Sequence, residues 1–147
     1  NEIYAKTEII DYLYIGTNPV DELLLGPAYA IAKILEKNKL TLNDIDVFEI
    51  HEAFAGQVLA NLNALNSDKF TETNHLKSKI GYIPIEKLNT YGGSLSLGHP
   101  FGATGVRLLN HASNRLVNEK KELALIASCA AGGLGHAMLV RNVLRQY

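Results

Sequence analysis

The spacing of apolar positions changes several times along the chain, and these changes predict where strands and helices lie. Residues 6–15 are rich in Ile, Tyr and Leu and end in a Gly-Thr-Asn-Pro turn, which is typical of a strand. Apolar residues recur at helical spacing in 28–38, in 53–65 and after Gly105, where Val106, Leu109, Ser113, Leu116 and Val117 mark one face. Further strands are predicted at 47–50, 88–96, 123–128 and 136–144.

This order of elements indicates the fold class. Strands alternate with helices, a polar excursion at 66–79 interrupts the pattern, and two final strands form a hairpin around a glycine-rich turn at 129–135. Such an order predicts an α/β layered domain with a mixed sheet and helices on its faces. No linker or repeat divides residues 1–147, so we expect one domain.

Composition and charge narrow the classes of protein that this chain resembles. Fourteen basic and fifteen acidic residues give a formal net charge of −1, which argues against nucleic-acid binding and against an anionic membrane surface. The single cysteine, Cys129, excludes an internal disulfide framework, and no Cys/His spacing fits a zinc site. No apolar run approaches the ~20 residues of a membrane span. The chain starts at Asn1 and its only methionine is Met138, so we expect a piece of a longer protein.

A glycine-rich stretch at 92–105 contains the first candidate for chemistry. It reads Gly-Gly-Ser-Leu-Ser-Leu-Gly-His-Pro-Phe-Gly-Ala-Thr-Gly, with His99 just before Pro100 and ahead of a predicted helix. Gly102 and Gly105 lie three residues apart and would let another backbone approach closely. Taken alone, the stretch is equally consistent with an ordinary turn before a core helix.

Three polar groups follow the ends of predicted strands: His51, His99 and Cys129. In an α/β sheet such ends gather at one rim, where ligands usually bind. A thiol and two imidazoles there would suit acyl transfer or proton transfer near neutral pH. Each group also has a purely structural interpretation, since buried cysteines are commonly inert and His51 could cap a helix.

Three sequence blocks carry a family resemblance. The blocks are His-Glu-Ala-Phe-Ala at 51–55, Gly-His-Pro-Phe-Gly-Ala-Thr-Gly at 98–105 and Cys-Ala-Ala-Gly-Gly-Leu-Gly at 129–135. In order and spacing they resemble the active-site blocks in the C-terminal half of a thiolase. The resemblance implies one βαβαβαββ half of a thiolase-like layered fold. It also implies that an N-terminal half, with the nucleophilic cysteine and a loop domain, is absent from this chain.

The resemblance assigns roles to the three polar groups. His99 resembles the histidine that activates the missing nucleophile and helps to bind the thioester or keto oxygen. Cys129 resembles the acid/base cysteine that protonates the departing acetyl-CoA carbanion and then deprotonates CoA. His51 stands where many thiolases have an asparagine that positions water in an oxyanion hole. A histidine there is similar to the thiolases of fatty-acid β-oxidation, the trifunctional-type β subunits and their bacterial relatives.

Four further residues are implied in oxyanion or substrate binding. Ala131 stands where glycine is common and would donate its backbone N–H to the second oxyanion hole, which an alanine can do if its φ is negative. Gly98, which precedes His99, and Gly132, which follows Ala131, are the other two glycine positions implied in this binding. Phe54 is expected to line the acyl pocket.

The implied reaction is cleavage of a 3-ketoacyl-CoA by CoA to acetyl-CoA and a shortened acyl-CoA, in fatty-acid β-oxidation, with no cofactor and no metal. The implied partners are CoA thioesters, the missing N-terminal half, a second copy in a homodimer or tetramer, and a hydratase/dehydrogenase subunit. We expect a bacterial cytoplasmic protein, with the mitochondrial matrix as the alternative. The chain alone is expected to be inactive.

Three alternatives stay open. A biosynthetic acetoacetyl-CoA thiolase would share all three blocks. A decarboxylating ketoacyl synthase would have His-Thr in place of His99-Pro100 and would lack Cys129. A non-catalytic lipid-binding or scaffold protein on the same fold would keep the motif residues only as relics.

Overall fold

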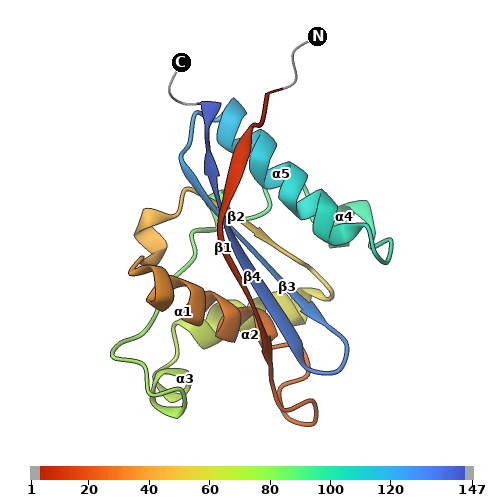
Figure 1. The fold of residues 1–147 in the computed structure, drawn as a ribbon. Coiled ribbons are helices and arrows are strands. Elements are labelled where there is room, and N and C mark those ends of the chain that lie inside the picture. Colours follow the sequence, from red (N-terminus) through yellow and green to blue (C-terminus); the bar gives the residue numbers. More distant parts are fainter. Residues whose placement is uncertain (1–3, 145–147) are drawn as a thin grey trace.

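The computed structural model describes residues 4–144 and contains one mixed β-sheet with helices on both faces (Figure 1). Short 3₁₀ turns cover Leu42–Asp44 and Ile85–Lys87. In chain order the elements are β1 (Thr7–Gly16), α1 (Gly26–Asn38), β2 (Val47–Ile50), α2 (Ala55–Leu65), α3 (Asp68–Thr73), α4 (Ser94–Leu97), α5 (Thr104–Asn118), β3 (Leu123–Ala130) and β4 (Leu134–Asn142).

The sheet confirms the predicted α/β class. Its strand order is β1-β4-β3-β2, with β2 parallel to β3 and the other neighbours antiparallel. Ile50 pairs with Ala127, so the end of β2 lies beside the last residues of β3. The hairpin turn between β3 and β4 is short, because Cys129 and Ala130 still belong to β3 and only 131–133 lie between the strands.

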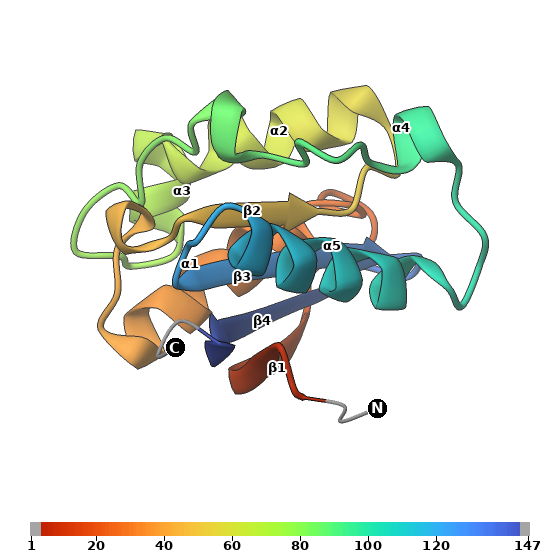
Figure 2. The same ribbon diagram turned by 90° about the horizontal axis from the view of Figure 1, so that it is seen from above.

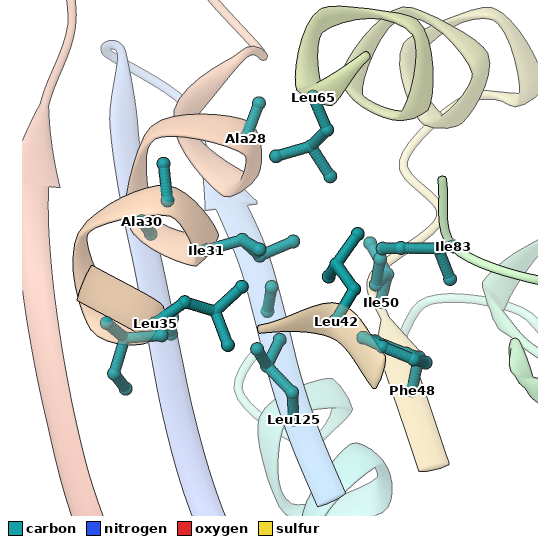
Figure 3. Close-up of a cluster of buried hydrophobic side chains, with 14 of the residues drawn as sticks. Ala28, Ala30, Ile31, Leu35, Leu42, Phe48, Ile50, Leu65, Ile83 and Leu125 are labelled. Carbon is teal, nitrogen blue, oxygen red and sulfur yellow. The ribbon is translucent and has the colours of Figure 1, made fainter. Parts of the chain in front are cut away.

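Helices cover the two faces of the sheet unequally. Figure 2 shows α5 on one face, α1 on the other, and α2 and α4 beyond the β2 edge. Beneath α1 lies the larger core, which joins residues of α1, α2 and three strands; Figure 3 shows Ile31, Leu35, Phe48, Ile50 and Leu125 turned toward one another. Burial of each such side chain contributes about 1.5–3 kcal/mol. This core therefore fixes α1 and α2 against the sheet.

The start of α1 packs on β4 by a backbone contact. A Cβ at Gly26 would lie 2.6 Å from the Cα of Gly135, and a Cβ at Gly135 would lie 2.5 Å from the carbonyl oxygen of Gly26. Both positions therefore require glycine. Pro27 occupies the first turn of α1, where backbone N–H groups have no partner within the helix, so a proline without an N–H costs no hydrogen bond there.

The face that α5 buries differs from the predicted one. Leu108, Ala112 and Leu116 are the buried apolar residues, whereas Val106 is 62% exposed. The predicted apolar face included Val106 and did not include Arg115, but Arg115 is buried because it pairs with Glu49 of β2. A Cβ at Gly102 or Gly105 would meet nothing within 4 Å, so no described part of this chain approaches these glycines, and the close approach of another backbone there stays a prediction.

The predicted strand at 88–96 is wrong. Leu88 forms a single parallel bridge with Phe48, and the chain then turns at Asn89, whose φ is +48°. The Asn89 side chain takes the place of a strand neighbour: its Oδ1 accepts from the N–H of Ile50 and its Nδ2 donates to the carbonyl of Ile50, both at 2.8 Å. The Asn89 side chain thus satisfies the backbone N–H and C=O of Ile50 at the edge of β2. The residues that follow turn away from the sheet and form α4.

One smaller difference from the predicted elements lies in the polar excursion. The excursion at 66–79 contains α3, whose Phe70 is buried against Tyr29 with ring centroids 4.9 Å apart. Among residues 4–144 no helix is long and apolar enough to cross a membrane.

Candidate active site

A corner segment, residues 89–105, joins the edge of β2 to α5, and Glu52 holds it in place. The Glu52 carboxylate accepts from the Nδ2 of Asn89 at 2.7 Å and from the backbone N–H of Leu95 at 3.0 Å. Gly93 leaves room for this carboxylate, because a Cβ there would overlap it and displace the end of the Glu52 side chain from these bonds. Glu52 therefore fixes the start of α4 next to the end of β2.

His51 and His99 meet at this corner. Their ring centroids are 4.3 Å apart, although 47 residues separate them in the chain. His51 continues β2, because its N–H donates to the carbonyl of Ala127 at 2.8 Å, and its residue is only 4% exposed. The alternative role of His51 as a helix cap does not hold, since the N-cap of α2 is Phe54. His99 lies on the exposed loop between α4 and α5.

Each imidazole is held at Nδ1 by a hydroxyl that the sequence analysis did not single out. His51 Nδ1 is 3.1 Å from Ser94 Oγ, and His99 Nδ1 is 2.6 Å from Thr104 Oγ1. Arg107 donates to Ser94 Oγ and to the carbonyl of Gly98, both at 2.7 Å. Ser94 and Thr104 lie within five residues of His99, and this nearness in the chain could have indicated them as its supports. The helical spacing of apolar residues gave no indication of Arg107.

The surroundings of His51 favour its neutral form. Burial lowers the pKa of His51, and the nearby His99 and Arg107 lower it further, while Glu52 acts in the opposite direction. His51 is thus suited to donate or accept a hydrogen bond without carrying charge.

Cys129 lies at the same end of the parallel pair as His51. Its position in β3 is two residues beyond Ala127, which pairs with the last residue of β2. Cys129 is hydrogen-bonded to neither His51 nor His99 in the described chain; it lines a separate cavity of about 340 Å³ with Tyr14 and His136. Burial raises the pKa of the Cys129 thiol, so the resting group is protonated.

The remaining predicted residues lie around these groups. Gly98 ends α4 with a φ of +88° and Gly132 turns the β3–β4 hairpin with a φ of +90°. Ala131 is not among the described residues with positive φ, which meets the condition set for its backbone N–H. Phe54 is 65% exposed and lines a different cavity, of about 410 Å³, with Gln57 and residues 21–25.

A second buried polar group, unpredicted from the sequence, joins α5 to β2. Glu49 Oε1 accepts from Arg115 Nη1 at 2.8 Å, and Glu49 Oε2 lies 3.8 Å from His111 Nδ1. Burial raises the pKa of Glu49 to about 7 against the opposing effect of Arg115. Residues 4–144 contain no group of three or more His, Cys, Asp or Glu side chains that could hold a metal ion.

The chain matches a family model and many known proteins. The model described as "Thiolase, C-terminal domain" matches residues 3–142. A probable 3-ketoacyl-CoA thiolase of Caenorhabditis elegans is 60% identical over 141 residues, which are 95% of this chain and 32% of the relative. The mitochondrial trifunctional enzyme subunit beta of Bos taurus is 58% identical over 137 residues, 92% of this chain and 29% of the relative.

The fold leads to the same class. The crystal structure of human mitochondrial 3-ketoacyl-CoA thiolase in complex with CoA superposes with a TM-score of 0.74 at 31% identity, over 93% of this chain and 30% of that one. The fold is therefore that of a thiolase half, with a mixed sheet between helices. The chain belongs to the thiolase family, in which it corresponds to the C-terminal domain, and it spans about a third of the length of these relatives.

Proposed function

We propose that this chain is the C-terminal domain of a thiolase subunit that cleaves 3-ketoacyl-CoA with CoA to acetyl-CoA and a shortened acyl-CoA in fatty-acid β-oxidation. The observation that carries the proposal is the paired His51 and His99 at the end of β2, with Cys129 at the same end of the adjacent strand. The names of the worm and bovine relatives support the β-oxidation branch.

In the first half-reaction, His99 takes the proton from a cysteine thiol that the N-terminal half supplies. The thiolate attacks the 3-keto carbon, and the bond between C2 and C3 breaks to leave an acyl-cysteine and the acetyl-CoA carbanion. Cys129 gives its proton to that carbanion. Its raised pKa fits this step, because the buried thiol rests protonated.

In the second half-reaction, the Cys129 thiolate takes the proton from CoA. The CoA thiolate then attacks the acyl-cysteine, and the nucleophile leaves as a thiolate that recovers its proton from His99. Negative charge develops on oxygen in the two tetrahedral intermediates, at the 3-keto carbon and at the acyl-cysteine, and in the enolate. His51 and the backbone N–H of Ala131 are the proposed donors, because fixed donors in a dry site stabilise such charge strongly.

The N-terminal half is proposed to cover the open face of α5. Val106 is 62% exposed there and borders a cavity of about 320 Å³ with Gly102, Gly105 and Leu109. An exposed apolar surface of this kind marks a contact site. We further propose a homodimer or tetramer that works with a hydratase/dehydrogenase subunit. The bovine relative's name describes that protein as mitochondrial, which supports a mitochondrial location for this chain over the bacterial cytoplasm.

The roles are tested by capture of a labelled acyl-enzyme. The protein used is the complete subunit, meaning this chain in one polypeptide with a thiolase N-terminal half. With a labelled acyl-CoA as donor, Cys129→Ala should still accept the acyl group but lose turnover by about 10²-fold or more, since it lacks the acid/base group. His99→Ala should acylate more slowly by a similar factor.

Two results would contradict these assignments. One is normal turnover by Cys129→Ala, and the other is acylation of His99→Ala at the parent rate. Leu95→Ala is the control, because its side chain is 58% exposed and only its backbone contacts Glu52. It should acylate and turn over like the parent.

A further inference from the structure

We propose that Ser94, oriented by Arg107, is a positioning residue that holds His51 in the neutral tautomer with its proton on Nε2. The geometry stands on the contacts of these three side chains, whereas the catalytic consequence rests on the proposed function. A serine hydroxyl has one proton to donate and two lone pairs that accept.

Arg107 determines which hydrogen bond the hydroxyl of Ser94 accepts and which it donates. A guanidinium only donates, so Ser94 Oγ must accept from Arg107 Nη2 at 2.7 Å. The remaining side-chain partner of Ser94 Oγ in the described chain is His51 Nδ1 at 3.1 Å. If Nδ1 carried the proton, the hydroxyl proton of a residue only 8% exposed would lack this acceptor. The contacts are all satisfied when Ser94 donates to Nδ1.

The charged groups around His51 act in the same direction. Arg107 and His99 face it with positive or potentially positive charge, and burial disfavours an imidazolium, while Glu52 provides the opposing negative charge. A neutral imidazole that accepts at Nδ1 has its proton at Nε2. His51 therefore presents an N–H donor in the corner that it shares with His99.

This tautomer explains how a histidine can work where many thiolases have asparagine. An asparagine amide always has N–H donors, whatever the neighbouring groups. A neutral histidine has one, and the group bonded to the other nitrogen decides where it lies. Here Ser94, oriented by Arg107, donates to Nδ1 of His51 and so leaves the proton on Nε2. Without them, the proton could move to Nδ1 and leave an acceptor facing the developing oxyanion.

The test combines a spectroscopic readout with kinetics in the complete subunit. Protein labelled with ¹⁵N in its histidine rings reports the protonated nitrogen, and the His51 signals are identified by their loss in His51→Asn. In the parent, above the pKa of His51, we expect the proton on Nε2. Ser94→Ala should lose this preference, and its kcat should fall about 10-fold to 10²-fold with KM changed less than about threefold, which is less than the roughly 10²-fold to 10³-fold loss for removing an oxyanion-hole donor itself.

Two variants separate positioning from a structural role. Ser94→Thr keeps the hydroxyl and should restore both the Nε2 signal and kcat. Ser96→Ala removes a hydroxyl from the same helix that donates to the carbonyl of Gly93 and not to His51. It should match the parent in both readouts.

The outcomes are distinguishable. A proton on Nδ1 of His51 in the parent overturns the inference, as does a Ser94→Ala protein that keeps both the Nε2 tautomer and its kcat. A complete subunit that forms no acetyl-CoA overturns the proposed function instead, and the ¹⁵N spectra of the parent and Ser94→Ala then decide the tautomer by themselves.

Discussion

The core beneath α1 and the corner at residues 89–105 are built in different ways. In the core, apolar side chains from α1, α2 and the sheet pack against one another, and shape and volume decide the arrangement. In the corner, single polar side chains bond to backbone groups far away in sequence, as Glu52 does with Leu95 and Asn89 with Ile50. Many interchangeable contacts define the core, whereas few and specific ones define the corner.

This difference predicts how each region responds to substitution. Truncation of a core side chain leaves a cavity and lowers the free energy of unfolding, and the size of this loss depends little on which residues surround it. A lost corner side chain removes named hydrogen bonds and should move the histidine pair more than it changes stability.

The largest effect is expected in the core. Phe48 is fully buried in β2, so Phe48→Ala should lower the free energy of unfolding by about 3–5 kcal/mol. Phe101 is 91% exposed, and Phe101→Ala should change that free energy by less than about 0.5 kcal/mol. Urea unfolding of both variants measures the contrast. Similar losses for the two would show that burial in this structure does not determine stability.

A pH-dependent effect is expected at Glu49. Its folded pKa of about 7 lies above the ordinary 4.5, so between these values the folded protein holds a proton that the unfolded chain has released. Stability should therefore fall as the pH rises from about 4.5 to about 7, by about 3 kcal/mol from this group, and change little from it above that.

Glu49→Gln is the matched variant, because it stays uncharged throughout. Depressed pKa values of His51, His111 and His136 act in the opposite direction in both proteins, so the difference between the two unfolding curves reports Glu49 together with its contact to His111. A difference that is flat from pH 4.5 to pH 7 would refute the raised pKa.

The smallest of the three effects on stability is expected at the corner. Asn89→Ala loses three side-chain hydrogen bonds, to Ile50 twice and to Glu52, and places alanine at a positive φ. We expect a loss of about 2 kcal/mol. Asn89→Gly loses the same bonds but suits the backbone, so it should recover about 1 kcal/mol. Equal stability of the two variants would show that the backbone at position 89 carries no strain.

The regions also differ in how far the sequence predicted them. Most elements of the sheet and its large helices follow from apolar periodicity, since α1, β2 and β3 lie where the pattern placed them. Periodicity failed where a polar group replaced a strand or entered the core. Asn89 substitutes for a strand neighbour, and Arg115 is buried because Glu49 lies opposite it.

The candidate site was predictable in its residues and unpredictable in its contacts. His51 and Cys129 could be chosen because each stands at the end of an apolar strand, and His99 because it lies in a recognisable block, although the strand predicted before it is absent. For the supporting Ser94 and Thr104 the only signal was their nearness to His99 in the chain, and for Arg107 there was none, because their roles come from distances across the corner that no local pattern encodes.

The central claim is that this domain completes a thiolase site, and turnover by the complete subunit tests it most directly. With a 3-ketoacyl-CoA and CoA, acetyl-CoA should form at a rate that depends on His99 and Cys129, and this chain alone should form none, since its only cysteine is Cys129. If the complete subunit forms no acetyl-CoA, or if the isolated chain forms it at a comparable rate, the account is contradicted.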